Sequence, residues 1–350
     1  MPTEPPPPTL ELRIDTEALA HNWRTMDHLS GAGRAGAAVK ADAYGIGIDI
    51  AVPVLVEAGA RDFFVAHWSE VPPLLAHVPA QSISVLHGPL TQAEAAFAAE
   101  TGVRPVINSL HQARVWRNAG GGPCHLMVDT GINRLGLPLD ALGESVLDDL
   151  EIEVLMSHLA SADEDRRQNA LQLTRFHHAM TARPARAHSL ANSAGVALGE
   201  DYTFELTRPG LALYGGIPRR ELAGRIEQVV YLRAQVLQVR DLDRGERVGY
   251  NATYTVGTPI RAATVSLGYA DGFMRSWSGQ SAFRFEGASL PQIGRVSMDM
   301  VVLDASAAPG IRAGDWVEIP YSLPEAEKQS GLSQYELLTS LGNRFARGRR

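Results

Sequence analysis

A lysine at the end of a short apolar run is the first feature of this chain that suggests covalent chemistry. Lys40 directly follows residues 37–39, Ala-Ala-Val, which are typical of a buried strand. Partly desolvated surroundings disfavour the ammonium form of a lysine, and the neutral amine is the nucleophile that forms Schiff bases. Taken alone, however, a lysine at a strand end is more often a salt-bridge partner. The residues around Lys40 must decide between these two roles.

Polar residues of the kind found in active sites recur at the ends of further apolar runs. The runs span residues 37–39, 63–66, 83–86, 104–107, 125–128, 154–156, 187–190 and 204–206. The polar residues that follow them, in the same order, are Lys40, His67, His87, Asn108, Asp129, His158, Asn192 and Arg208. In a parallel barrel the carboxyl ends of the strands form one face, and active sites are built on that face.

The elements that must position these residues alternate along the chain. Amphipathic segments such as residues 142–150 and 166–180 separate the apolar runs, which is typical of repeated strand–helix units. About eight such units predict an α/β fold, an eight-stranded parallel (β/α)8 barrel of the TIM type. An open, doubly wound sheet is the alternative, but it does not need eight units or a polar residue after every strand.

An all-β pattern replaces this alternation after about residue 216. Short β-rich segments stand at residues 233–239, 262–266, 281–285, 301–304 and 316–319, with turn signals such as Glu286-Gly287 between them. The sequence therefore predicts a flexible proline-rich tail at residues 1–8, a barrel at residues 9–220 and a C-terminal all-β domain at residues 221–350. The first strand, residues 9–14, could belong to the β-domain instead of the barrel.

Composition and charge exclude several classes of partner. The 350 residues include 32 Lys plus Arg and 39 Asp plus Glu, a formal net charge of −7 that offers no attraction for nucleic acid. A single cysteine, Cys124, permits no intrachain disulfide and fits a reducing compartment. No apolar run approaches the roughly 18 residues of a membrane span, and the N-terminus lacks the pattern of a signal peptide. We therefore expect a soluble, cytoplasmic protein without nucleic-acid or membrane partners.

Motifs spread along the chain resemble those of the alanine racemase family. Residues 38–45, Ala-Val-Lys-Ala-Asp-Ala-Tyr-Gly, are similar to the cofactor-binding signature of the family. The other motifs are Val-Asp-Thr-Gly-Ile-Asn-Arg-Leu-Gly at 128–136, Met-Ser-His-Leu-Ala at 156–160, Ala-Asn-Ser at 191–193, Thr-Arg-Pro-Gly-Leu-Ala-Leu-Tyr-Gly at 207–215, Gly-Tyr-Ala-Asp-Gly at 268–272 and Gly-Arg-Val-Ser-Met-Asp at 294–299. The resemblance covers roughly residues 10–347. Each motif alone is weak, but their order and spacing together are specific.

The resemblance implies pyridoxal 5′-phosphate (PLP) as the cofactor, bound covalently to Lys40. It places Arg208, whose guanidinium can only donate hydrogen bonds, at the pyridine nitrogen of the cofactor. That contact keeps the nitrogen unprotonated, which weakens the cofactor as an electron sink and limits side reactions. His158 is expected beside the cofactor ring and linked to Arg208.

The phosphate group of the cofactor is expected after the seventh and eighth runs. The hydroxyl of Ser193 and the backbone N–H groups of Gly210 and Leu211 suit a phosphate dianion, because glycine permits close approach. The resemblance adds Tyr44, with a second hydroxyl, and Asn192 to the cofactor-binding residues. Asn192 and Ser193 also match a helix cap, and the two roles are compatible.

Racemisation requires two acid/base groups on opposite faces of the substrate Cα. Lys40 supplies one group, and Tyr269 is expected to supply the other. In the family this tyrosine comes from the partner subunit, so the resemblance implies a homodimer with shared active sites. It also implies that Arg134 and the backbone N–H of Met298, again from the partner, bind the substrate carboxylate. No metal site is expected.

Three positions depart from the family pattern. Met127 stands where many members carry a carbamylated lysine that orients the residue equivalent to Arg134, so a bound anion or another side chain must orient Arg134 here. Arg349 stands where a C-terminal tyrosine of the family reaches the phosphate, which alters cofactor affinity or substitutes an arginine contact. Ile46 replaces a histidine of the signature, and we expect little consequence for the chemistry.

The predicted function is that of an alanine racemase, the PLP-dependent interconversion of L-alanine and D-alanine that supplies D-alanine for peptidoglycan. A PLP-dependent racemase of serine, lysine or a broad set of amino acids is the alternative within this chemistry. A non-catalytic PLP-binding protein is a further alternative, but such proteins resemble a lone barrel. Related barrel decarboxylases place a carboxylate at the pyridine nitrogen and use a partner cysteine, whereas Cys124 begins a barrel strand at the wrong end.

Overall fold

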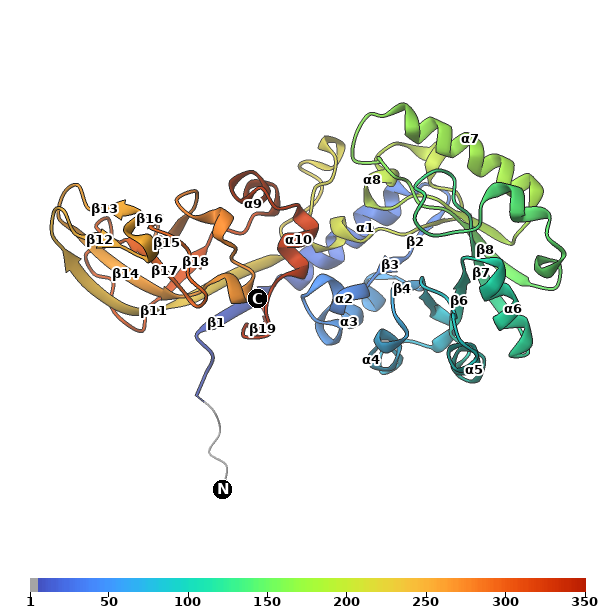
Figure 1. The fold of residues 1–350 in the computed structure, drawn as a ribbon, viewed down its shortest axis with the longest axis horizontal. Helices are drawn as coiled ribbons and strands as arrows, with labels where there is room; N and C mark the ends of the chain where they lie inside the picture. Colours follow the sequence, from blue (N-terminus) through green and yellow to red (C-terminus); the bar gives the residue numbers. More distant parts are fainter. Residues whose placement is uncertain (1–5) are drawn as a thin grey trace, which may run out of the picture. The chain divides into compact units, whose positions relative to one another are not determined.

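A computed structural model of the protein describes residues 6–350 (Figure 1). The proline-rich tail predicted at residues 1–8 lies mostly outside these described residues. Internal contacts divide the described chain into two compact units. One unit consists of Glu17–Glu227, and the other combines residues 6–16 with Gln228–Arg350.

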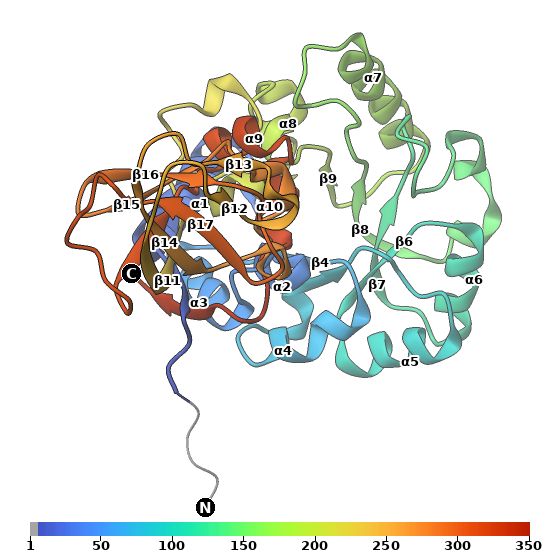
Figure 2. The same cartoon turned by 60° about the vertical axis from the view of Figure 1, so that its left-hand side comes forward.

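The unit Glu17–Glu227 alternates between strands and helices, as its sequence pattern predicts. Its strands are β2 (Arg34–Ala35), β3 (Ala37–Ala38), β4 (Phe63–Val65), β5 (Ile83–Val85), β6 (Arg104–Ile107), β7 (Pro123–Met127), β8 (Glu151–Met156), β9 (Ala187–Ser189) and β10 (Leu206–Thr207). Its helices are α1 (Thr16–Leu29), α2 (Lys40–Tyr44), α3 (Ile48–Ala58), α4 (Val71–Leu75), α5 (Gln92–Thr101), α6 (Leu110–Asn118), α7 (Arg167–Ala182) and α8 (Ser193–Val196). Helices α4 to α7 lie around the outside of the parallel strands (Figure 2).

Within residues 6–350, strands β3 to β9 form one seven-stranded parallel sheet in chain order. The eighth predicted strand, β10, pairs in parallel with β2 in a separate two-stranded sheet. β10 has two residues because Phe204 before it adopts a φ of 49° and Pro209 after it has no N–H to extend a ladder. The prediction of a parallel strand–helix fold is thus confirmed, whereas an eight-stranded sheet is not what these pairings show.

Backbone hydrogen bonds nevertheless connect β10 to both ends of the seven-stranded sheet. Arg208 N donates to Ala191 O at 2.8 Å, which joins the end of β10 to the segment after β9. Ala38 N, in β3, donates to Pro209 O at 2.9 Å. The segments that follow β9, β10 and β3 therefore lie next to one another, and these are the segments that carry Ser193, Arg208 and Lys40.

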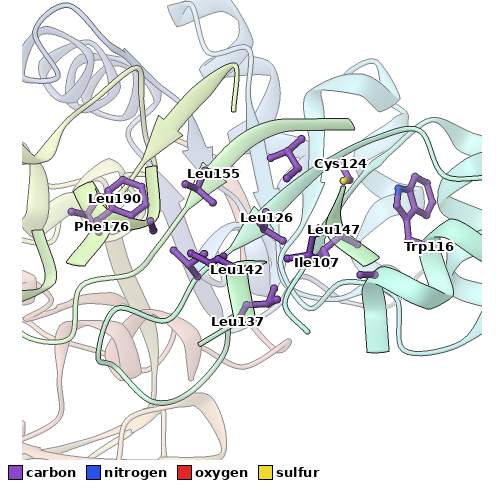
Figure 3. Close-up of a cluster of buried hydrophobic side chains, with 14 of the residues drawn as sticks. Ile107, Trp116, Cys124, Leu126, Leu137, Leu142, Leu147, Leu155, Phe176 and Leu190 are labelled. Carbon is purple, nitrogen blue, oxygen red and sulfur yellow. The ribbon is translucent and has the colours of Figure 1, made fainter. Parts of the chain in front are cut away.

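A cluster of fully buried apolar side chains holds the helices on this sheet (Figure 3). Leu126 and Leu155, on the neighbouring strands β7 and β8, belong to it together with Trp116 of α6 and Phe176 of α7. Truncating such an aromatic residue to alanine costs roughly 3–5 kcal/mol. Cys124 lies in the same cluster, and burial raises the pKa of its thiol to about 12. Cys124 is therefore a core residue in its thiol form.

The second unit is an antiparallel β structure with two short helices. Its strands are β1 (Leu10–Ile14), β11 (Val230–Leu242), β12 (Arg247–Val248), β13 (Tyr254–Thr255), β14 (Ile260–Ser266), β15 (Ala282–Phe285), β16 (Ala288–Ile293), β17 (Met300–Asp304), β18 (Trp316–Ile319) and β19 (Ala346–Arg349). Its helices are α9 (Leu323–Ser330) and α10 (Gln334–Thr339). Strands β14, β17, β16, β15, β18 and β11 follow one another in the sheet, and a further β14–β11 pairing closes them into a barrel. The predicted C-terminal all-β part is confirmed.

Strand β1 pairs antiparallel with β11, with Leu12 opposite Leu232. Leu10, Leu12 and Ile14 are buried, while the intervening Glu11 and Arg13 point outward, as the period-2 pattern requires. On its other side β1 pairs in parallel with β19, the last strand of the chain. The first strand therefore pairs with strands of the β unit, in agreement with its contact grouping.

Candidate active site

Lys40 stands directly after β3, at the start of an unusual turn. Ala41, Asp42, Ala43 and Tyr44 all have positive φ, between 52° and 57°, so α2 is a single left-handed turn. This conformation costs an L-residue roughly 1–2 kcal/mol. Such strain persists only where the surroundings determine the backbone, which is common at functional sites.

Glu70 determines the backbone on one side of this turn. Its carboxylate accepts hydrogen bonds from the N–H groups of Ala41 at 2.5 Å, Ala66 at 2.7 Å and His67 at 2.9 Å. The residue next to Lys40 is thereby tied to the end of β4. The sequence reasoning missed Glu70, although a glutamate three residues after the strand-end His67 matches a capping position.

The pKa of Lys40 is lowered from its ordinary value, chiefly by burial and then by the positive charge of Arg134. Arg208 acts in the same direction, and Glu70 opposes the shift. A lowered pKa increases the fraction of neutral amine, which is the nucleophilic form. The surroundings of Lys40 therefore favour the nucleophile over the ordinary salt-bridge lysine.

Arg208 is buried, with 6% of its surface exposed. Its guanidinium donates to the hydroxyl of Ser189 and, at 2.5 Å, to the backbone oxygen of Ser157. Burial lowers the pKa of Arg208 to about 10, and no carboxylate within residues 6–350 forms an ion pair with it. Arg208 therefore brings a cation into the site without a neutralising partner, and it can only donate.

His158 shares this electrostatic environment. The pKa of His158 is lowered to about 3, first by burial and then by the positive charges of Arg208, Arg134 and Lys40. The imidazole is therefore neutral at physiological pH. The predicted neighbourhood of His158 and Arg208 agrees with this coupling, although no direct hydrogen bond joins the two side chains among the described residues.

The hydroxyl oxygen of Ser193 accepts hydrogen bonds from two backbone N–H groups of the segment after β10. Its Oγ accepts from Gly210 N at 2.9 Å and from Ala212 N at 3.1 Å, so its hydroxyl proton is left to donate. In the part of the chain that the structure describes, Leu211 N–H, between these two donors, has no acceptor. Asn192 caps α8 by accepting from Gly195 N at 2.8 Å, in line with the cap interpretation.

Gly210 lies against the side chain of Tyr44. A Cβ on Gly210 would overlap Tyr44 Oη and lie 2.8 Å from Tyr44 Cζ, so the glycine is needed for this approach. The ring of Tyr44 stacks on Tyr214 with 4.7 Å between ring centroids. Tyr214 in turn donates to Ala38 O at 2.8 Å. The sequence reasoning missed Tyr214, because a tyrosine in the apolar run Leu-Ala-Leu-Tyr is typical of a core residue.

The loop that carries Arg134 is held by the carboxylate of Asp129 and by side chains of α7, which include the guanidinium of Arg175, a donor to Thr130 O at 3.0 Å. Asp129 Oδ1 accepts from the N–H groups of Gly131, Ile132 and Asn133 at 2.8, 3.0 and 3.1 Å. Helix α7 supports the loop from the other side through Gln172, which donates to Thr130 Oγ1 at 3.1 Å. Arg134 itself is exposed and forms no ion pair within the described residues.

Met127, at the position of the family's carbamylated lysine, is buried against this loop. A Cβ on Gly136 would lie 3.1 Å from Met127 Cγ. A thioether offers no charge to orient Arg134, so the loop is fixed by the Asp129 carboxylate and by side chains of α7.

Tyr269 and Met298 lie in the β unit, on two segments in contact. Tyr269 N donates to Ser297 O, and Ala270 N donates to Met298 O, each at 3.0 Å. Met298 is half exposed, and the guanidinium of Arg275 lies over the ring of Tyr269 at 5.4 Å from its centroid. The structure therefore brings these two predicted residues together. Lys40, Arg134, His158, Arg208 and the phosphate group residues belong to the other unit.

Across residues 6–350, no three His, Cys, Asp or Glu side chains are placed so that they could hold a metal ion together. In the same part of the chain, no helix combines the length and the apolar character that crossing a membrane requires.

Comparison with protein families identifies both units. Residues 14–218 match the model of the alanine racemase N-terminal domain, and residues 229–348 match that of the C-terminal domain. The chain belongs to the alanine racemase family. It is 42% identical to the alanine racemase of Rhizobium meliloti (strain 1021), over 96% of this chain and 95% of the relative, and 41% identical to that of Brucella canis, over 96% and 92%. The resemblance inferred from the motifs is thereby confirmed.

Solved structures of alanine racemases also resemble this chain. A crystal structure of the alanine racemase from Bartonella henselae with covalently bound pyridoxal phosphate has a TM-score of 0.91 at 36% identity, covering 98% of this chain and all of that one. The biosynthetic alanine racemase from Pseudomonas aeruginosa has a TM-score of 0.87 at 31% identity, covering 98% and 99%.

Proposed function

We propose that the protein is an alanine racemase that interconverts L-alanine and D-alanine with PLP bound to Lys40. The observation that carries this proposal is the pairing of a lysine of lowered pKa with a buried arginine that has only neutral partners. The names of the relatives and their near full-length coverage support the same activity.

The residues of the site fit PLP. The amine of Lys40 would attach the cofactor, and the Arg208 guanidinium would donate to its pyridine nitrogen, with the neutral His158 beside the ring. The phosphate would be held by three hydrogen-bond donors close to Gly210: the hydroxyls of Tyr44 and Ser193 and the backbone N–H of Leu211. The Asn192 cap would fix the segment that carries Ser193. When bound, PLP withdraws electron density from the substrate Cα and so acidifies its C–H bond.

Two proton-transfer residues would then act on opposite faces of Cα. We assign one face to the Lys40 amine and the other to the hydroxyl of Tyr269 from a partner subunit. Arg134 and the Met298 N–H of that subunit would bind the substrate carboxylate. The proposed assembly is therefore a homodimer with shared sites.

The finer architecture belongs to this proposal. The bonds that connect β10 to the segments after β9 and before Lys40 support a closed eight-stranded barrel as the cofactor-binding part, residues 9–220 without the strand at residues 10–14. Residues 221–350 would form the part that contributes Tyr269 and Met298, with β1 counted among its strands because β1 pairs with β11. We further propose a cytoplasmic enzyme that supplies D-alanine for peptidoglycan.

The test is the formation of D-amino acids by the PLP-loaded protein. Chiral chromatography after incubation with L-alanine, L-serine and L-lysine in separate reactions should show D-alanine as the main product. Faster formation of D-serine or D-lysine would replace alanine with another substrate. A protein that binds PLP but produces no D-amino acid would contradict catalysis.

A further inference from the structure

The two segments of the β unit that carry Tyr269 and Met298 are packed backbone to backbone. A Cβ on Gly268 would overlap the Met298 carbonyl oxygen and lie 2.5 Å from Asp299 N. Only a glycine permits this approach. Because Tyr269 follows Gly268 directly, the position of its side chain depends on the segment around Met298.

Arg344 joins these two segments with one guanidinium. Its Nε and Nη2 donate to the two carboxylate oxygens of Asp271 at 2.6 and 2.8 Å, and its Nη1 donates to Asp299 Oδ1 at 2.7 Å. Asp271 lies two residues after Tyr269, and Asp299 follows Met298. All three bonds are charge-assisted, and the pair with Asp271 is bidentate, which fixes orientation as well as distance.

The carboxylate of Asp271 also accepts a hydrogen bond from within the loop that carries Tyr269. Its side chain is 1% exposed, and its Oδ2 also accepts from Gly268 N at 2.9 Å. The loop is thus closed on both sides of Tyr269 by one buried carboxylate. A buried charge of this kind requires a partner, and Arg344 is its partner.

A third segment of the chain presents Arg344 to the loop. Gly342 N donates to Asp271 O at 3.3 Å, and a Cβ on Gly342 would lie 2.9 Å from Ala270 O. The segment between α10 and β19 therefore packs directly on the Tyr269 loop. The arginine belongs to this close contact rather than to a free surface.

We propose that Arg344 is a positioning residue for racemisation, which holds the Tyr269 hydroxyl and the Met298 N–H in a fixed relation through Asp271 and Asp299. This inference rests on the proposed function, because it assigns Arg344 to a residue that transfers a proton. Arg344 does not contact substrate in this role. A misplacement of about 1 Å in a reacting group can lower a rate about 100-fold, so the fork geometry is what matters.

Arg344→Lys tests the proposal, because lysine keeps the positive charge beside Asp271 but lacks the planar fork. The matched control is Arg261→Lys on β14, whose arginine also pairs with an aspartate in the same unit, Asp241 at 3.5 Å. Asp299→Asn is a milder second variant, because it weakens the contact with Arg344 and leaves Asp271 paired.

The deciding measurement is the exchange of Cα–H in deuterated water, followed separately from L-alanine and from D-alanine at early times. Each enantiomer is supplied at saturating concentration, so that a change in carboxylate binding through the Met298 N–H does not enter the comparison. Lys40 and Tyr269 each serve one enantiomer, so Arg344→Lys should lower exchange from one enantiomer 10- to 100-fold and from the other less than 3-fold. PLP affinity should stay unchanged. Equal loss from both enantiomers, or parent-like exchange from both, would overturn the proposal.

A second readout needs no activity. Protein labelled with 3-fluorotyrosine should show one ¹⁹F resonance that Tyr269→Phe removes, and Arg344→Lys should shift or broaden this resonance while Arg261→Lys leaves it in place. An unchanged resonance in Arg344→Lys would also contradict positioning. If the unaltered enzyme fails to racemise alanine, the proposed function fails, whereas failure of the ¹⁹F or exchange comparison in an active enzyme refutes only the role of Arg344.

Discussion

Gly210→Ala tests the assignment of the phosphate site with a single methyl group. The new Cβ would overlap Tyr44 Oη and lie 3.3 Å from Ala38 Cβ. Tyr44 is buried and stacked on Tyr214, so its ring cannot turn away without disturbing its neighbours. The φ of Gly210 is −133°, outside the left-handed region that favours glycine, so the expected effect comes from the clash.

The loss can be estimated from the hydrogen bond that the clash removes. A hydrogen bond to a charged group contributes roughly 1.5–3 kcal/mol, and each 1.4 kcal/mol changes a dissociation constant tenfold. Displacing the Tyr44 hydroxyl from a phosphate dianion should therefore weaken PLP binding about 10- to 150-fold. Tyr44→Phe removes the same hydroxyl without adding an atom, so it should give a loss of similar size.

The assay is a titration of the apoprotein with PLP, followed by quenching of protein fluorescence. Gly143→Ala is the matched control, because a Cβ on Gly143 would meet nothing within 4 Å in the same unit. It should bind PLP like the parent. Parent-like affinity in both Gly210→Ala and Tyr44→Phe would refute the phosphate site at this position.

Three further results are expected. Lys40→Ala should abolish covalent attachment, so borohydride treatment followed by mass spectrometry should find no PLP adduct in the variant and one in the parent. Gln172→Ala removes one of the three α7 side chains that bond the Arg134 loop and should raise KM for alanine about 3- to 10-fold, because a lost hydrogen bond contributes about 0.5–1.5 kcal/mol. An unchanged KM would show that the Gln172 contact does not position Arg134. Burial lowers the pKa of His125 to about 4, so the unfolded state binds more protons than the folded state below about pH 6.5. The free energy of unfolding should therefore fall by up to about 3 kcal/mol as the pH drops from about 6.5 to about 4. His125→Gln should flatten this part of a urea-unfolding profile, and equal slopes in variant and parent would disprove the linkage.

The rule that active-site residues follow the strands of a parallel fold predicted much of the site from sequence. Lys40, His158 and Arg208 stand at such ends, and the structure places the charge of Arg208 close enough to lower the pKa of both Lys40 and His158. The eighth strand was less predictable. Its length depends on the backbone at Phe204 and Pro209, which hydrophobic periodicity does not report.

The groups that hold the site were harder to predict than the site residues. Residues Ala41 to Tyr44 include ordinary helix formers, and their sequence does not indicate a left-handed turn. The carboxylates that stabilise this turn are those of Glu70, which accepts from Ala41 N, and of Asp42, which accepts from Ile48 N. Similarly, Arg344, the charged partner of Asp271, lies 73 residues away along the chain. Contacts of this kind are set by tertiary packing, so propensity and pattern carry no signal for them.

In the function proposed above, this protein moves the Cα proton of alanine between two faces. The most direct measurement incubates the PLP-loaded enzyme with L-alanine in deuterated water and follows Cα deuteration by NMR and D-alanine by chiral chromatography. We predict deuterium at Cα together with D-alanine rising to equal the L-enantiomer. Deuterium without D-alanine would show that no group acts on the second face, and absence of both would contradict the assignment of racemase activity.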